Sequence, residues 1–323
     1  MKKLMIVVMG MALGAGASVA ASMAQAEPSG SRGKRAPLIV NEPAEHFFYM
    51  CSKPRLSATD GKPSAFADLL DFRFPPDITC TEQGAERYVD AIAGSNTTHL
   101  FVNVNYQRSF FPSRVIEPVW TSLDEPDRTK SKSVRDRMSA YIREAVARYD
   151  VDGVELDLIR FPFYFRKGTE VKNAPILTAF VREIRGICTA EAGRRGHPMK
   201  IAVRLLPDPQ HAMKMGVDVG TWAREGLVDM VIVCNMYGSI EYEYRLGDWR
   251  KLLGDKVLLV AGTDNGIVEN GKRRVLNLDE YRRWIDLMRR DGADGIYFFN
   301  FPLRPFLDET WRGILGDRAM TGS

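Results

Sequence analysis

The chain has 323 residues, of which 45 are Lys or Arg and 41 are Asp or Glu, so its formal net charge is only +4. No run of basic residues alternates with aromatic ones, which argues against a nucleic-acid partner. The four histidines and four cysteines are scattered without the spacing of a metal site, so neither a metal nor an organic cofactor is expected. Cys188 and Cys234 fall in apolar patterns typical of buried thiols, whereas a Cys51–Cys80 disulfide is left open.

The first 26 residues have the pattern of an export signal. Lys2 and Lys3 precede an apolar, small-residue stretch from Leu4 to Ala21, and Ala24-Gln25-Ala26 is a typical cleavage site. A membrane anchor is the alternative, but a basic stop-transfer flank is missing. We therefore predict a signal peptide over residues 1–26, a disordered leader over 27–37 and one domain over 38–318. The mature protein is expected to be periplasmic or extracellular, with no membrane association.

Short apolar strands alternate with amphipathic helices along the rest of the chain. Strands are predicted at His46–Cys51, His99–Asn105, Gly153–Leu158, Lys200–Leu205, Asp229–Cys234, Lys256–Ala261 and Gly295–Phe299. Helices are predicted at Glu82–Ala93, Val134–Tyr149, Ile176–Glu191 and Asp279–Arg290, the last capped by Asn277 or Asp279. An eighth strand lies either at Leu38–Asn41 or within Tyr106–Lys132. The alternation predicts an α/β fold, a single-domain (β/α)8 TIM barrel. A doubly wound open sheet is the alternative, but its Gly-rich phosphate loop is missing.

The most informative segment runs from Asp152 to Pro162. Side chains alternate along a strand, so Glu155 and Asp157 share the face opposite Val154 and Leu156 and are expected inside the barrel. Two buried acids are costly unless they are paired or used in chemistry, and close carboxyls push one pKa upward. A catalytic role, foremost for Asp157, is favoured over an ion pair with an arginine such as Arg160 that only stabilises the barrel.

Polar residues also end the other strands, where a barrel builds its active site. An isolated strand-end asparagine usually bonds its own turn, but several together favour a lined pocket. Aromatic side chains nearby would stack on the flat face of a sugar. The predicted substrate-binding residues are His46, Asn103, Asn105, Arg108, Arg160, Arg204, Asn235, Tyr237 and Asn300.

The segment Asp152-Gly-Val-Glu-Leu-Asp-Leu-Ile-Arg-Phe-Pro162 resembles the D-G-(I/V)-x-(L/F)-D-x-x-R-(F/Y)-P segment of the family-10-like glycosyl hydrolases, which are exported bacterial TIM-barrel proteins. Shorter stretches resemble the same family in the same order: Asn103–Arg108, Phe111–Ser113, Pro118–Trp120, Met199–Leu205, Trp222–Asp229, Asn235–Tyr237 and Gly295–Asn300. The resemblance implies hydrolysis of glycosidic bonds, with Asp157 as the leading catalytic carboxylate.

Glycoside hydrolysis uses two carboxyl groups, so Asp157 needs a partner. Glu155 is expected to orient or support it, and Asp264, at the end of another strand, is the first choice for the second acid; Glu241 and Glu243 follow. The molecule that the protein is predicted to bind is thus a carbohydrate substrate. A non-catalytic glycan-binding barrel is the alternative. A phosphodiester-cleaving barrel is less favoured, because only His46 is suitably placed for it.

Overall fold

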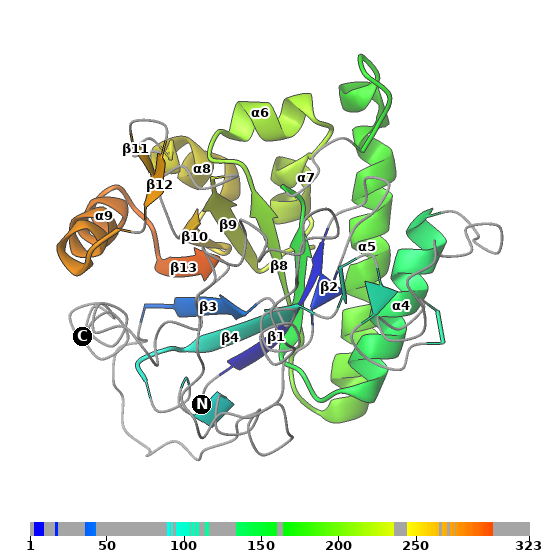
Figure 1. The fold of residues 1–323 in the computed structure, drawn as a ribbon. Helices are drawn as coiled ribbons and strands as arrows, with labels where there is room; N and C mark the ends of the chain where they lie inside the picture. Colours follow the sequence, from blue (N-terminus) through cyan, green and yellow to red (C-terminus); the bar gives the residue numbers. More distant parts are fainter. Residues whose placement is uncertain are drawn as a thin grey trace, which may run out of the picture.

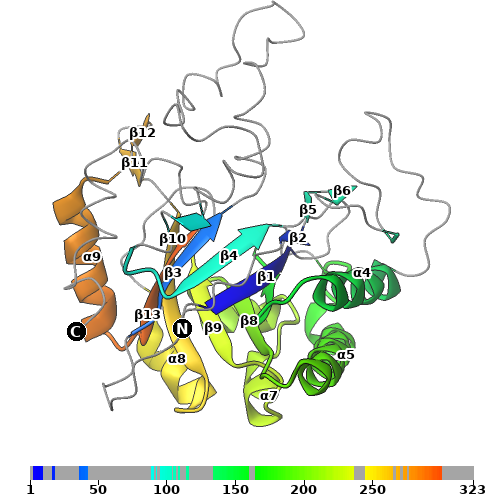
Figure 2. The ribbon, with the colours of Figure 1, turned by 90° about the horizontal axis from the view of Figure 1, so that it is seen from below.

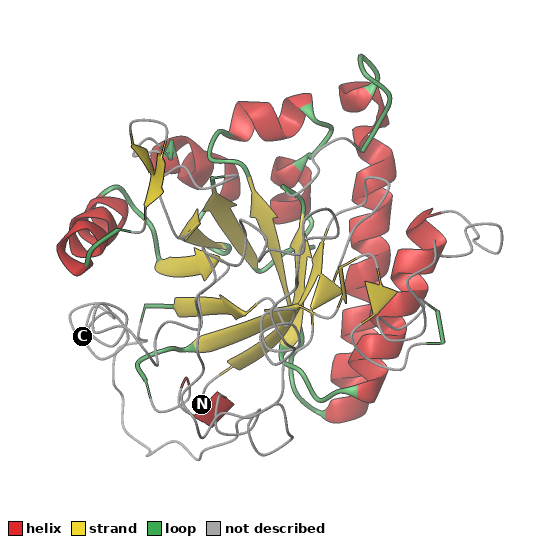
Figure 3. Cartoon of the chain, viewed as in Figure 1, coloured by secondary structure: helices red, strands yellow, loops and turns green. Residues whose placement is uncertain are grey.

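The computed structural model describes residues 3–9, 17–18, 36–42, 89–90, 92, 95–103, 105–106, 108–109, 114–115, 134–159, 164–235, 244–264, 267–269, 272–274 and 276–299. Within these residues, parallel strands stand side by side in the centre and helices cover the outer face of the strands from β7 round to β13 (Figures 1 and 2). Figure 3 shows the same arrangement coloured by type of secondary structure.

The parallel strands form the predicted (β/α)8-type barrel. Seven of them follow the chain: β3 (Leu38–Glu42), β4 (His99–Asn103), β7 (Gly153–Asp157), β8 (Lys200–Leu205), β9 (Met230–Cys234), β10 (Leu258–Asp264) and β13 (Gly295–Phe299). Their order around the barrel is β4-β3-β13-β10-β9-β8-β7, and each neighbouring pair is parallel. The strand predicted at Leu38–Asn41 is therefore confirmed as β3.

An eighth strand, β1 (Lys3–Met9), stands between β4 and β7 and closes the barrel. Met5 is the register partner of Phe101 on one side, and Met9 is the partner of Asp157 on the other. This strand belongs to the segment predicted to be an export signal, so cleavage after Ala26 would remove it and leave the seven strands above. The predicted strand His46–Cys51 and most of Tyr106–Lys132 lie outside the described residues.

The helices agree with the predicted periodicity, with longer bounds in the middle of the chain. They are α4 (Val134–Arg148), α5 (Glu170–Arg195), α6 (Pro209–Lys214), α7 (Val219–Arg224), α8 (Leu246–Leu253) and α9 (Leu278–Arg290). Asn277 caps α9 in a reciprocal capping box with Glu280. Of the predicted helix Glu82–Ala93, only residues 89–90 and 92 are described, and they are helical. Short strands complete the described structure: β2 (Ala17–Ser18), β5 (Asn105–Tyr106), β6 (Arg108–Ser109), β11 (Ile267–Glu269) and β12 (Lys272–Arg274).

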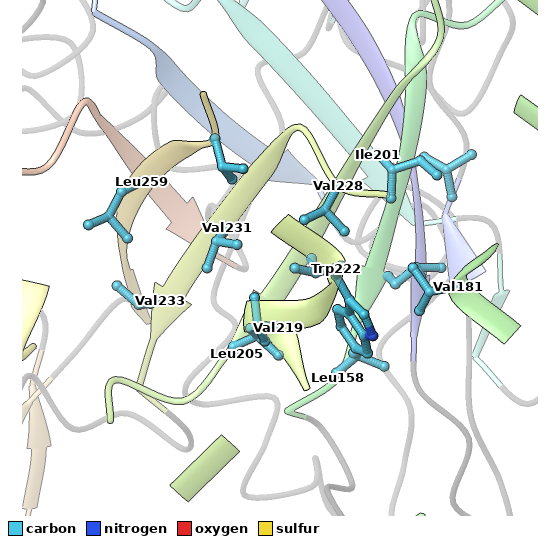
Figure 4. Close-up of a cluster of buried hydrophobic side chains, with 14 of the residues drawn as sticks. Leu158, Val181, Ile201, Leu205, Val219, Trp222, Val228, Val231, Val233 and Leu259 are labelled. Carbon is cyan, nitrogen blue, oxygen red and sulfur yellow. The ribbon is translucent and has the colours of Figure 1, made fainter. Parts of the chain in front are cut away.

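Two hydrophobic cores lie on the two faces of the barrel strands. The outer core lies between strands and helices; there Trp222 of α7 lies between Val231 and Val233 of β9 on one side and Val181 of α5 on the other (Figure 4). The inner core fills the barrel lumen with side chains of the opposite strand face: Ile39, Phe101, Ile159, Ala202, Met230, Ile232, Cys234, Val260, Tyr297 and Phe299. The period of two along each strand therefore decides which residues reach the lumen.

Aspartates at two helix-to-strand joints fasten the amino end of the barrel. Asp229 accepts a hydrogen bond from the N–H of Ile201 in the neighbouring strand (2.9 Å) and forms an ion pair with Arg185 of α5 (2.5 Å). Asp294 does the same with the N–H of Leu259 (2.7 Å) and with Arg250 of α8 (2.5 Å). We call Arg185–Asp229 and Arg250–Asp294 the amino-end pairs. Each ties a helix to two adjacent strands at the point where the strands begin.

Candidate active site

Glu155 and Asp157 of β7 lie inside the barrel, as the strand alternation predicts. Both are fully buried, and their contacts reach residues of other strands across the lumen. Val154 and Leu156, on the opposite face, belong to the outer core. Two acids therefore stand two residues apart on one inward face. We call Glu155, Asp157, Arg204, Tyr297 and Phe299 the lumen cluster.

Asp157 is paired with Arg204 of β8. The two residues are register partners on neighbouring strands, and Arg204 Nη2 donates to Asp157 Oδ2 at 2.5 Å. The backbone N–H of Ile159 donates to the other carboxylate oxygen at 3.2 Å. Asp157 thus accepts one hydrogen bond from a cation and one from the backbone. Arg160, which the sequence offered as the partner, lies outside the described residues; strand pairing brings in Arg204 instead.

The guanidinium of Arg204 is fixed on several sides. Its Cζ lies 3.4 Å from the ring centroid of Phe299, and its Nη1 donates to the sulfur of Cys234 at 3.7 Å. Its Nε lies 3.8 Å from Glu155 Oε1 and has no hydrogen-bond partner among the described residues. Burial acts to lower the pKa of Arg204, but Asp157 and the other acidic groups around it outweigh burial, so the pKa lies above its ordinary value.

Glu155 has a different environment from Asp157. It accepts hydrogen bonds from the phenol of Tyr297 at 3.1 and 3.2 Å, whereas Arg204 is beyond hydrogen-bonding distance. Burial raises the pKa of Glu155 to about 8, and the charge of Asp157 adds to this, while Arg204 and Tyr297 oppose it. At neutral pH Glu155 therefore holds a proton, while its neighbour on the strand is paired with a cation.

The other predicted site residues divide by what is described. Asn235 is buried directly after β9, and Arg204 is buried in the lumen cluster, not at the surface of a pocket. Asp264 ends β10, Asn103 ends β4, and Asn105 and Arg108 belong to β5 and β6, but only their backbone is described. The remaining predicted residues lie outside the described ones: His46, Arg160, Tyr237, Glu241, Glu243 and Asn300.

The sequence interpretation missed Tyr297 and Phe299. The signal was present, because Tyr297 and Phe299 alternate with Ile296 and Phe298 along β13, just as the two acids alternate along β7. Both faces of β13 carry apolar side chains, however, so the sequence alone does not show which face points into the lumen. Cys188 and Cys234 were expected as buried thiols, and this is confirmed.

The described residues contain no group of three or more His, Cys, Asp and Glu side chains arranged to hold a metal ion. Within the same part of the chain, no helix is both long and apolar enough to span a bilayer.

The described chain is thus a parallel α/β barrel with an acid pair in its lumen. No protein-family model matches it, and no curated protein sequence does. Its fold is similar to that of a glycoside hydrolase family 18 N-acetylglucosaminidase from Paenibacillus barengoltzii, with 14% identity over 57% of this chain and 76% of that chain and a TM-score of 0.42. It is also similar to the PgaB (BpsB) glycoside hydrolase domain from Bordetella bronchiseptica, with 15% identity, 63% and 68% coverage and a TM-score of 0.42.

A third similar structure is the chitinase ChiW from Paenibacillus sp. str. FPU-7, with 12% identity, a TM-score of 0.48, and 87% of this chain but 33% of that chain covered. These structure neighbours are glycoside hydrolases with barrel folds. Similarity at this level assigns neither a family nor an activity, because one barrel fold hosts many functions.

Proposed function

We propose that the protein is an exported glycoside hydrolase, which cleaves the glycosidic bonds of a poly- or oligosaccharide with two carboxyl groups. The observation that carries the proposal is the pair Glu155 and Asp157, which share the inward face of β7 but have unlike partners. Neighbouring carboxyls with such unlike environments are typical of an acid and a base in one active site. The resemblance of the Asp152–Pro162 segment to family-10-like glycosyl hydrolases points to the same chemistry.

The proposed roles follow from the partners of the two acids. Asp157, paired with Arg204, supplies the carboxylate that attacks the anomeric carbon or takes a proton from the attacking water. Glu155 supplies the proton that the leaving glycosidic oxygen accepts as its bond to carbon breaks. The Cα atoms of two residues on one face of a strand are about 6.6 Å apart, and glycoside hydrolases place their two carboxyl groups roughly 5 to 9.5 Å apart. The proposal requires that the sugar reach Asp157 from the carboxyl end of β7.

One observation favours the alternative, a glycan-binding barrel without catalysis. Asp157 is fully buried and hydrogen-bonded to Arg204. These are the properties expected of an ion pair that only stabilises the barrel. In that case the aromatic and polar residues at the strand ends would bind a glycan, and neither acid would react.

The experiment that separates the two functions is hydrolysis of a broad panel of polysaccharides by the chain from residue 27 onward. Asp157→Asn and Glu155→Gln are compared with the unmodified protein, and Asp229→Asn of the amino end serves as the matched control. The proposal predicts sugar release that both lumen variants lose and the control keeps. Equal release by all four proteins would remove the acid pair from the mechanism, and glycan binding without release would favour the alternative.

Export is tested separately. We propose cleavage after Ala26, so the secreted protein should begin at Glu27 when its intact mass or amino-terminal sequence is measured. A protein that keeps Lys3–Met9 would contradict the export signal and would instead assign these residues permanently to β1.

A further inference from the structure

The lumen cluster joins opposite walls of the barrel. β13 is separated from β7 by β10, β9 and β8, so Tyr297 and Phe299 face the acids from across the lumen. Tyr297 reaches Glu155 by its hydroxyl at 3.1 Å, and Phe299 lies against the guanidinium of Arg204 at 3.4 Å. Two consecutive inward residues of one strand therefore contact two different members of the cluster.

The two rings are themselves held in place. Tyr297 and Phe299 stack nearly parallel, with 6.5 Å between ring centroids and 13° between planes, and Phe101 packs edge-on against Tyr297 at 5.7 Å. Gly262 of β10 also lies against Tyr297, because a Cβ there would lie only 3.2 Å from the Tyr297 ring and 3.0 Å from Cys234 Cβ. The aromatic rings thus have little room to shift, which suits a support for a charged group.

The charges of the cluster need such a support. One guanidinium faces two carboxyl groups in a fully buried volume, and an unpaired buried charge is strongly destabilising. The guanidinium hydrogen-bonds one of the two acids: Arg204 bonds Asp157 at 2.5 Å, and its ion pair with Glu155 is longer, at 3.8 Å. Glu155 is bonded by a neutral phenol instead. A shift of the guanidinium toward Glu155 would break this division.

We propose that Tyr297 and Phe299 are positioning residues: Phe299 holds the guanidinium of Arg204 against Asp157, and Tyr297 fixes the carboxyl of Glu155 by its hydrogen bond. The effect of this arrangement on catalysis rests on the proposed function, whereas its effect on the protonation of Glu155 does not. The described titratable groups that face Glu155 are Asp157 on its own strand, Arg204 on β8 and Tyr297 on β13. Cys234 of β9 faces Arg204.

Burial raises the pKa of Glu155 and the hydrogen bond from Tyr297 opposes this rise, which predicts how a variant should behave. Donation by the phenol favours the ionised form of Glu155. Removal of the hydroxyl in Tyr297→Phe, which keeps the ring and its stacking, should therefore move the pKa of Glu155 further upward. A residue with only a packing role would leave this titration unchanged.

The first test needs no substrate. The protein is labelled with ¹³C at the glutamate side-chain carboxyls and titrated by NMR from pH 4 to pH 10, and the Glu155 signal is identified by its loss in Glu155→Gln. Tyr297→Phe should move the Glu155 titration to higher pH. Tyr281→Phe is the matched control, because Tyr281 is equally buried but packs on Phe298 outside the lumen, and it should change nothing. An unchanged Glu155 titration in Tyr297→Phe would overturn the role of Tyr297.

The second test uses glycoside hydrolysis, once a substrate is found. Tyr297→Phe and Phe299→Leu should lower kcat by roughly 10-fold to 100-fold with little change in KM, as expected when a reacting group is displaced. Tyr297→Phe should also move the alkaline limb of the pH profile upward. Phe298→Leu, which alters the outward neighbour, serves as the control for Phe299→Leu. Shifted NMR titrations without any hydrolysis would contradict the proposed function and keep the positioning role, whereas normal kinetics in both lumen variants would overturn the positioning role alone.

Discussion

Arginine–aspartate pairs occur at two levels of this barrel, and their bond lengths are the same. Arg185–Asp229 at the amino end and Arg204–Asp157 in the lumen both measure 2.5 Å. The side chains of the first pair are 21% and 25% exposed, whereas those of the second are 1% and 0% exposed. The two pairs therefore differ in their access to water and not in the length of this bond.

Water access decides what each pair can do. At the amino end, solvent screens the charges, and the pair adds a modest stabilisation to backbone hydrogen bonds that already join the strands. In the lumen no solvent screens the charges, so the loss of one partner leaves the other stranded. An arginine–aspartate pair therefore stabilises the fold at the amino end, whereas in the lumen it belongs to the candidate active site.

The largest effect is expected from the arginine of each pair. Arg204→Met should lower the free energy of unfolding by about 3–5 kcal/mol at neutral pH, because Asp157 is left buried without its cation. Arg185→Met should cost about 1–2 kcal/mol, since Asp229 keeps Lys200 and some solvent. Urea unfolding of both variants measures the difference. Equal losses would contradict the contrast between the two levels.

The next effect is the pH dependence of Glu155. Its pKa is raised from 4.5 to about 8, so the folded protein binds a proton that the unfolded chain releases between these values. Stability should consequently fall as pH rises from about 4.5 to about 8. Glu155→Gln removes this pH dependence. As pH rises across that range, the free energy of unfolding of the variant should increase by a few kcal/mol relative to that of the unmodified protein. Parallel stability curves for the two proteins would show that Glu155 is ionised in the fold.

Asp229 should show the opposite sign. Burial acts to raise its pKa, but hydrogen bonds from Lys200 and Arg185 outweigh burial and lower it. Its stabilisation is therefore present above the unfolded value of 3.8 and is lost as pH falls through the folded value. Asp229→Asn should cost about 1–2 kcal/mol at pH 7 and progressively less in acid, as measured by urea unfolding at pH 3 and pH 7. A cost that grows in acid would be inconsistent with this sign.

The smallest effect is expected at an exposed pair of the amino end. The hydrogen bond that His197 Nε2 donates to the Asp150 carboxylate raises the pKa of His197, so this contact stabilises the fold below the unfolded value of 6.5 and fades as pH rises through the folded value. Because Asp150 is 69% exposed, His197→Gln should cost at most about 0.5 kcal/mol at pH 5.5 and nothing measurable at pH 8. Thermal unfolding at the two pH values checks this prediction.

Much of the barrel could be predicted from the sequence, because strand and helix periods are local properties. Neighbouring residues alone predicted the strands at Gly153–Asp157, Lys200–Leu205 and Gly295–Phe299 and narrowed the cap of α9 to Asn277 or Asp279. The inward direction of Glu155 and Asp157 followed from the period of two. The role of Lys3–Met9 could not be predicted in the same way, because an apolar run suits both an export signal and a buried strand.

The sequence by itself determined the alternation of elements and the faces of each strand, since these depend on residues a few positions apart. Only the tertiary structure decided the partners within the lumen. Asp157 pairs with Arg204 because β7 and β8 are adjacent in register, and Glu155 meets Tyr297 because β13 faces β7 across the barrel. These two residues are 142 positions apart in the chain, and a local sequence pattern does not predict a contact between such distant residues. The protonation state of Glu155 follows from the same closure, because burial is a property of the whole barrel.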